Sequence, residues 1–215
     1  TLPTAQLRGM LALKRAELAQ TMRDTAHRLA EVEARLAWLE QGNDPSPYEV
    51  VVKSVPEVPV ASLRQLVPHA GEMGYYCQAL TRALYRKLTA AAVSWSGPEL
   101  ILYHADEYRE TDLDVEVCVA LPAPLPARPP RADADVTFRV LPAYDLVGAL
   151  IYEGPFAEMT TAVLELVRWS GIHQHVPVGP LREIHLSGPA HPLTPTAGDP
   201  VVELQYPIAR IDVAG

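Results

Sequence analysis

The sequence has little cysteine: Cys77 and Cys118 are the only two, they lie 41 residues apart, and neither belongs to a CxxC pair. Isolated thiols of this kind argue against a structural zinc site and are typical of a reducing compartment. We therefore predict a cytoplasmic protein without structural disulfides. His173 and His175 are close together, but no cysteine is nearby and proline follows, so we interpret them as loop residues rather than metal ligands.

Long hydrophobic runs and nucleotide-binding or hydrolase motifs are also missing. No apolar run approaches the ~20 residues that cross a bilayer, and the N-terminus lacks the pattern of a signal peptide. The sequence contains no P-loop, no GxGxxG and no GxSxG. We therefore expect no membrane partner, no metal and no cofactor.

Basic residues are outnumbered, with 18 Lys and Arg against 26 Asp and Glu and a net charge of −8. The first 41 residues carry a net +1, so the remainder carries −9. An acidic surface repels phosphate groups, and for this reason we predict that these 215 residues alone do not bind duplex DNA specifically.

Residues 5–41 predict one long helix, because they lack proline and contain only one glycine. Apolar residues recur every seven positions in two series offset by four: Leu11, Leu18, Val32 and Leu39, and Met22, Leu29 and Leu36. Such a narrow stripe favours pairing with a second helix, so we predict a coiled-coil segment over 1–44 and a homodimer through 5–41. The alternative is a helix packed on its own domain, and the sequence leaves the relative direction of the paired helices open.

After residue 45 the sequence repeats one pattern, a strand, a helix and two strands, over about 46–121 and again over 135–212. Gly71 and Gly97 are 26 residues apart in the first copy, and Gly154 and Gly179 are 25 apart in the second. A proline-rich linker, 122–134, joins the copies. The predicted fold class is α+β, with a duplicated β-α-β-β domain over 45–215 and a pseudo-twofold axis.

The last strand of each copy alternates apolar and polar residues. In "DVEVCVAL" and "VVELQYPI" the apolar positions face one way, while Glu116 and Glu203 share the other face without a nearby base. The helices should cover the apolar face. We predict that the two glutamates point into one cleft, that their repulsion raises one carboxyl pKa, and that a cationic ligand relieves this cost.

A long heptad helix followed by such a duplicated domain resembles the C-terminal part of MerR-family multidrug-sensing transcriptional regulators of the BmrR-like kind. Its body resembles the GyrI-like, SOUL-related effector-binding domain. The motifs that carry the likeness are "SLRQLVPHAGEMGYYCQAL", "ELILYHADEYRETDLDVEVCVAL", "LVGALIYEGPFAEM", "GPLREIHLSGP" and "VVELQYPI". The resemblance implies an antiparallel dimer, a lipophilic and often cationic drug as ligand, and promoter DNA bound by a winged helix-turn-helix that would lie upstream of Thr1.

The resemblance also implies a buried glutamate in an aromatic pocket, which by motif position would be Glu203, with Glu116 as its repeat partner. We expect Glu116 to be the more solvated of the two. Aromatic residues near the strand ends and helix starts complete the predicted ligand site: Tyr103, Tyr75, Tyr76, Tyr144, Tyr152, Phe156 and Trp169. An aromatic ring beside a carboxylate suits an organic cation. Core packing is the alternative role for Tyr103 and for Trp169.

Two other functions stay open. Some GyrI-like proteins resemble this chain in fold and hydrolyse reactive small molecules, in which case Glu203 or Glu116 would be the general base. Haem binding, as in SOUL relatives, would require His185 or His104 as axial ligand. The long helix favours the ligand-sensing regulator, which is not an enzyme.

Overall fold

The computed structural model describes residues 14–15, 46–104, 111–125, 135–187 and 198–210. Most of the predicted helix 5–41 and of the linker 122–134 lies outside the described residues, although Lys14 and Arg15 are helical. The chain divides into two compact units, Thr1–Pro47 and Tyr48–Gly215. Among the described residues, no helix is long and apolar enough to cross a membrane.

The second unit is mixed α+β, with an antiparallel sheet and two α-helices. The first half contains β1 (Val51–Val55), β2 (Val58–His69), a short η1 (Ala70–Glu72), α2 (Met73–Ala90), β3 (Glu99–Tyr103) and β4 (Thr111–Ala120). The second half contains β5 (Thr137–Leu141), β6 (Tyr144–Glu153), η2 (Phe156–Glu158), α3 (Met159–Ile172), β7 (His175–Pro177), β8 (Leu181–Ser187) and β9 (Val201–Arg210).

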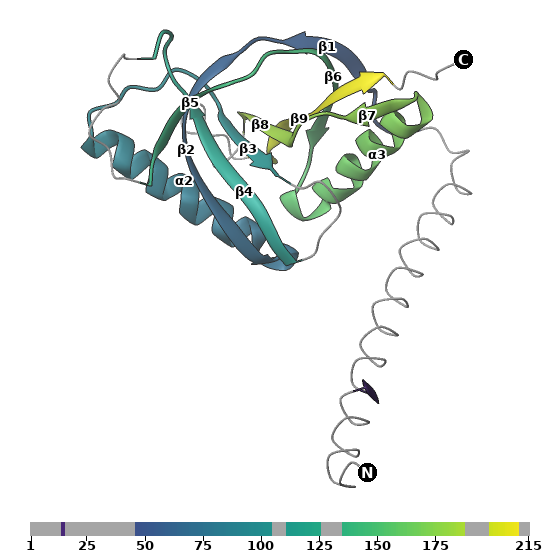
Figure 1. Cartoon of the computed structure of the whole chain (residues 1–215), viewed down its shortest axis with the longest axis horizontal. Coiled ribbons are helices and arrows are strands. Elements are labelled where there is room, and N and C mark those ends of the chain that lie inside the picture. Colours follow the sequence, from purple (N-terminus) through teal and green to yellow (C-terminus); the bar gives the residue numbers. More distant parts are fainter. Residues whose placement is uncertain (1–13, 16–45, 105–110, 126–134, 188–197, 211–215) are drawn as a thin grey trace, which may run out of the picture. The chain divides into compact units, whose positions relative to one another are not determined.

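The sheet runs β1-β6-β9-β8-β3-β4-β2-β5, and β7 pairs with β9. The two halves meet where β3 lies beside β8, and each half places its outermost strand on the other half, β1 on β6 and β5 on β2. Figure 1 shows the strongly curled sheet, with α2 beside the strands of the first half and α3 beside those of the second.

The first segment of each predicted repeat forms two strands rather than the single predicted one. Pro56 and Pro142 interrupt these segments, since proline cannot donate to a strand ladder, so the chain turns and continues in a new strand. Because of this break, β1 pairs with β6 rather than with β2, and β5 pairs with β2 rather than with β6. The exchange of edge strands decides which basic residues meet the two glutamates.

The helices cover the predicted face of the sheet. Leu84 and Leu88 of α2 pack with Val115 and Val117 of β4, all fully buried. Leu166 of α3 packs in the same way with Val202 and Leu204 of β9. Because side chains alternate along a strand, Glu116 and Glu203 lie on the face without helices.

Candidate functional site

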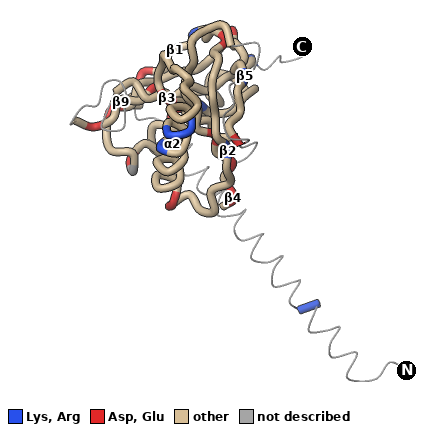
Figure 2. The backbone as a smooth tube through the Cα atoms, turned by 90° about the vertical axis from the view of Figure 1, so that its left-hand side faces the viewer, with Lys and Arg blue, Asp and Glu red and all other residues tan. Residues whose placement is uncertain are grey.

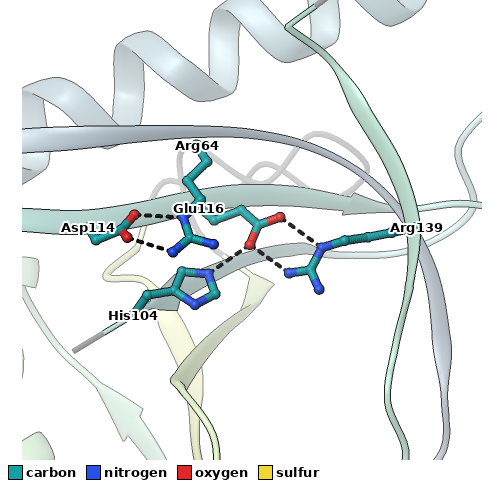
Figure 3. Close-up of polar contacts among 5 residues, drawn as sticks. All are labelled: Arg64, His104, Asp114, Glu116 and Arg139. Atoms are coloured by element: carbon teal, nitrogen blue, oxygen red, sulfur yellow. Dashed lines mark hydrogen bonds and ion pairs between the residues drawn. The ribbon is translucent and has the colours of Figure 1, made fainter. Parts of the chain in front are cut away.

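Glu116 lies on the helix-free face with its charge fully compensated. The side chain is 3% exposed. His104 Nε2 lies 2.7 Å from one carboxylate oxygen, and Arg139 of β5 donates to both oxygens at 3.1 and 2.6 Å (Figure 3). Burial alone would raise the pKa of this carboxyl, but hydrogen bonds from His104, Arg139 and Ser62 outweigh it and lower the pKa to about 2. Arg64 and Asp114 form a bidentate pair beside it.

Glu203 occupies the same position in the second half and also has a basic partner. It forms an ion pair with Lys53 of β1, whose side chain is 41% exposed. Two expectations were therefore wrong: bases do reach both glutamates, and Glu116 is the more buried one. The pKa rise predicted for one of the two carboxyls does not occur at Glu116, whose pKa is lowered. Arg139 and Lys53 come from the exchanged edge strands, far away in sequence, and two strands separate β4 from β9.

The predicted aromatic residues are dispersed over the unit. Tyr75 is 75% exposed and packs edge-on against Tyr76. The ring of Tyr144 lies under the guanidinium of Arg182, at 4.7 Å. Trp169 stacks between His173 and His175 on the side of α3, with ring centroids 4.3 and 5.6 Å away. Tyr152 packs near Tyr48, and its hydroxyl donates to the carbonyl oxygen of Pro155. The remaining two, Tyr103 and Phe156, lie in or beside a second polar cluster.

This second cluster, Glu99, Tyr103, Glu183 and His185, lies on the helix-covered face where the two halves join. Ile101 of β3 pairs with Glu183 of β8, and extending this register by two residues brings Glu99 opposite His185. The Tyr103 hydroxyl donates to Glu183 Oε2 at 2.5 Å. His185 directs Nε2 at Glu183 Oε1, 2.7 Å away, and Nδ1 at Glu99 Oε2, 3.4 Å away. The two carboxylates are thus joined through one imidazole.

The cluster is buried and rich in negative charge. Glu99, Glu183 and His185 are 2%, 1% and 7% exposed. Both ring nitrogens of His185 face carboxylate oxygens, which requires both to be donors and therefore the protonated ring. Burial opposes that charge, but hydrogen bonds to Glu183 and Glu99 raise the pKa of His185 to about 9. Burial, and then the charge of Glu183, raise the pKa of the Cys77 thiol on α2 to about 12.

Aromatic side chains flank the cluster on two sides. Phe156 lies 5.5 Å from the His185 ring, and it follows Pro155, which lines a cavity of about 690 Å³ together with Tyr48 and Tyr152. On the other side, burial, the nearby Glu99 charge and a hydrogen bond to Glu99 raise the pKa of Tyr85 on α2. Buried acids among aromatic rings can attract an organic cation.

The sequence reasoning missed Glu99 and Glu183 as site residues. Both are acids within short strands whose neighbours are apolar, in "GPELILY" and "GPLREIHL", and that pattern could have singled them out. Within the described part of the chain, no group of three or more His, Cys, Asp or Glu has an arrangement that could hold a metal ion.

Comparison with known proteins identifies the domain. The sequence pattern of the GyrI-like small molecule binding domain matches residues 48–209. No curated protein matches the sequence.

Among solved structures, EcmrR in its complex with DNA is similar at a TM-score of 0.66 and 22% identity, over 94% of this chain and 72% of that one. The isolated EcmrR C-terminal domain is similar at 0.65 and 22%, over 77% of this chain and all of that one. A structure described as a hydrolase from Listeria innocua is similar at 0.51 and 13%, over 80% and 98%. At these identities the likeness concerns the fold.

Proposed function

This chain belongs to the GyrI-like small-molecule-binding family, and from that premise we propose that it binds an organic cation at the cluster of Glu183, Glu99, Tyr103 and His185. The observation that carries the proposal is the pairing of two buried carboxylates with a single imidazolium on the helix-covered face. Two carboxyl groups share one histidine, so the cluster carries an excess of acid in a low-dielectric site. A bound monocation would neutralise it.

The face that carries Glu116 and Glu203 supports a ligand site less well. Glu116 is bonded to Arg139 and His104, and Glu203 is paired with Lys53, so neither offers unbalanced charge. A cation placed there would have to displace a base of this chain. We therefore assign Glu116 and Glu203 a structural role, and Tyr103 and Phe156 are the predicted residues that we keep at the ligand site.

We further propose that the domain is the ligand-sensing part of a dimeric transcriptional regulator, as the MerR-family resemblance implies. The likeness to DNA-bound EcmrR covers 94% of this chain, against 77% for the EcmrR C-terminal domain alone, which supports a counterpart for the N-terminal segment outside that domain. Residues 5–41 would pair two copies, and promoter DNA would be bound by a winged helix-turn-helix that these residues do not include. The equivalent pairings Arg139–Glu116 and Lys53–Glu203 support a duplicated, pseudo-twofold body.

The ligand proposal is tested with two probes of nearly the same shape. Anthracen-9-ylmethyl-trimethylammonium carries one positive charge, and 9-(2,2-dimethylpropyl)anthracene replaces its nitrogen with carbon. Glu183→Gln should weaken binding of the cation by about tenfold or more, since a charge-assisted contact is worth ~1.5–3 kcal/mol, and leave the neutral probe nearly unchanged. Equal losses of affinity for both probes would show that Glu183 contributes to the shape of the site but does not discriminate between a charged and a neutral ligand.

The dimer proposal has its own test. Leu29→Asp with Leu36→Asp should give monomers in sedimentation, because each new charge would be desolvated in the helix pair. Changes of the same kind outside the two heptad series, Gln20→Asp with Gln41→Asp, serve as the control. Dimers that persist in the leucine variant would exclude this interface.

Hydrolysis is the alternative proposal, favoured by the likeness in fold to the protein described as a hydrolase. A general base needs an oxygen that can accept a proton from water. Both oxygens of Glu183 are already engaged by Tyr103 and His185, which makes Glu183 a poor base in this arrangement. Conversion of a strained electrophile such as an epoxide to its diol, followed by mass spectrometry, would favour the enzyme over the sensor.

A further inference from the structure

A buried arginine lies on the helix-free face of the sheet, opposite the proposed cation site. Leu102 of β3 pairs with Glu116 on one side and with Arg182 of β8 on the other. Directly paired residues share a face of the sheet, so Arg182 lies in the same row as Glu116. Arg182 is 3% exposed. Its neighbour Glu183 points to the helix-covered face, because successive side chains of a strand alternate.

The groups that contact the Arg182 guanidinium are neutral. Nη2 donates to the carbonyl oxygen of Pro142 at 3.3 Å. The guanidinium carbon lies 4.7 Å from the centroid of the Tyr144 ring, and the Tyr144 hydroxyl is within hydrogen-bonding reach. In the part of the chain that the structure describes, Arg182 forms no ion pair, and its Nε has no acceptor in hydrogen-bonding geometry. A carbonyl and a phenol can accept hydrogen bonds, but they do not compensate a full positive charge.

The acid in the same row does not supply the missing negative charge. Both oxygens of Glu116 are bonded by Arg139, and one of them also contacts His104. The charge of Arg139 acts against that of Arg182: burial, and to a lesser extent Arg139, lower the pKa of Arg182. The charges of both arginines also act on the Cys118 thiol, but burial raises its pKa, so the thiol is neutral. Arg182 is therefore a buried base without a counter-charge.

We propose that Arg182 binds a compact monovalent anion, such as chloride or a short carboxylate, on the helix-free face beside Tyr144. Arginine stays protonated in proteins, and a buried charge is costly unless an opposite charge accompanies it. One monovalent anion compensates one guanidinium and accepts charge-assisted hydrogen bonds from its N–H groups. This inference is independent of the proposed cation site, which lies on the other face of the sheet and has the opposite excess of charge.

The surroundings of Arg182 restrict the size of this anion. The half-buried Tyr144 ring covers the guanidinium. The phenol is held in place by a close approach to Gly179, where an added Cβ would lie 2.5 Å from the Tyr144 hydroxyl oxygen and 3.0 Å from Cζ. Only a small group fits beside a guanidinium that is enclosed in this way. The enclosure excludes a bulky anion or the phosphate backbone of a nucleic acid.

The test follows thermal unfolding of the full chain at neutral pH and constant ionic strength, while chloride or acetate replaces camphorsulfonate, a monovalent anion too bulky for the enclosed position. We expect the melting temperature to rise with the compact anion and to level off at saturation, by about 3 °C or more in total. Arg182→Met removes the charge at similar side-chain length and should reduce the rise to less than about 1 °C. Arg168→Met is the matched control and should keep the rise, because Arg168 already pairs with Glu165.

A melting temperature of the unchanged protein that responds to neither anion, or that rises without levelling off, would overturn the inference whether or not the variants fold. A saturable rise that persists in Arg182→Met would also overturn it, because the anion would then bind elsewhere. Saturation at a lower concentration of acetate than of chloride would assign the site to carboxylates, and the reverse order to halides. Bromide, located by its anomalous signal in a crystal of the unchanged chain, should lie against the Arg182 guanidinium. Bromide confined to the protein surface would indicate an adventitious ion only and contradict the proposal.

Discussion

Two buried glutamates, Glu116 and Glu183, lie on opposite faces of one sheet and differ in the side chains that contact them. Each contacts a histidine, His104 or His185. The third group is Arg139 beside Glu116 but a second acid, Glu99, near Glu183. The first cluster therefore has a full set of bases, and the second has an excess of acid. A buried carboxylate is evidence for a binding site only when its partners leave charge or hydrogen-bonding capacity unused.

The same contrast appears at the level of the whole chain. Figure 2 shows acidic positions distributed over the body of the domain, with basic positions at α2 and at other elements. Net acidity alone did not reveal where the unbalanced charge lies, because Arg64, Arg139 and Lys53 neutralise one face of the sheet. The excess at Glu99 and Glu183 becomes evident only from the pairing of β3 with β8.

The largest expected effect comes from removing Arg139, one of the two basic partners of Glu116. Arg139→Gln should lower the free energy of unfolding by about 3 to 4 kcal/mol, because Glu116 would remain buried beside a neutral partner. This loss lies at the lower end of the range expected for breaking a buried ion pair, because the Arg139 side chain is itself 35% exposed and partly screened by solvent. Lys53→Gln is the matched control in the second half and should cost less than about 1 kcal/mol, as its side chain is mostly solvated. Urea denaturation measures both, and similar losses would refute the contrast between the halves.

The next effect is a dependence of stability on pH that belongs to His185. Its pKa is about 9 in the folded protein against an ordinary value of 6.5. When the pKa of a group is higher in the folded state than in the unfolded state, the group stabilises the fold fully at pH values below its unfolded-state pKa. This stabilisation is lost as the pH rises through the folded-state pKa. Stability should therefore decline between pH 6.5 and 9, by about 3 kcal/mol from this group.

His185→Gln provides the comparison for that decline. It keeps the two cysteines and every other titrating group, so the difference between the two pH profiles isolates the histidine. Thermal unfolding at several pH values would serve as the measurement. Parallel profiles for the variant and the unchanged protein would mean that His185 is not the charged link between Glu99 and Glu183.

A pair of matched substitutions sharpens the comparison further. Glu116→Gln should cost about 2 kcal/mol of stability, because it removes the anion held by Arg139 and His104. Glu183→Gln should change stability by less than about 1 kcal/mol, since losing one of two nearby acids relieves repulsion while it weakens the bond to His185. Chemical denaturation of both variants measures the two losses in the free energy of unfolding. A larger loss for Glu183→Gln than for Glu116→Gln would contradict this account.

The smallest effect is expected at Tyr75, one of the predicted ligand residues. Its ring is 75% exposed, so Tyr75→Ala should change stability by no more than about 0.5 kcal/mol. It should also leave the affinity for the trimethylammonium probe unchanged. Tyr103→Phe offers the contrast, as it removes the hydroxyl that donates to Glu183. A larger loss of probe affinity in Tyr75→Ala than in Tyr103→Phe would indicate that the ligand binds near the start of α2.

The α+β class and the helix-covered face could be predicted because they rest on local periodicity. Alternation in β4 and β9 decided which side of each strand is apolar, and α2 and α3 cover that side. The partners of Glu116 and Glu203 could not be predicted in this way. Arg139 and Lys53 reach them only after Pro142 and Pro56 split the first strand of each repeat and the edge strands pair across the halves.

The candidate site residues also fall into two groups, those that the sequence could suggest and those that it could not. Tyr103 could be proposed from the sequence because its strand was expected to lie beside that of Glu116, yet the structure places its ring on the other face, against Glu183. Glu183 and Glu99 were missed because their importance depends on the register between β3 and β8, which are distant in sequence.

The most direct measurement is a crystal structure of the chain with a heavy-atom version of the cationic probe, 10-bromoanthracen-9-ylmethyl-trimethylammonium. The bromine would be located by its anomalous signal. Our account predicts that the ammonium group lies on the helix-covered face, within ~5 Å of the carboxylates of Glu183 and Glu99, the range over which opposite charges interact strongly. A probe bound instead on the helix-free face, against Glu116 or Glu203, would contradict the account.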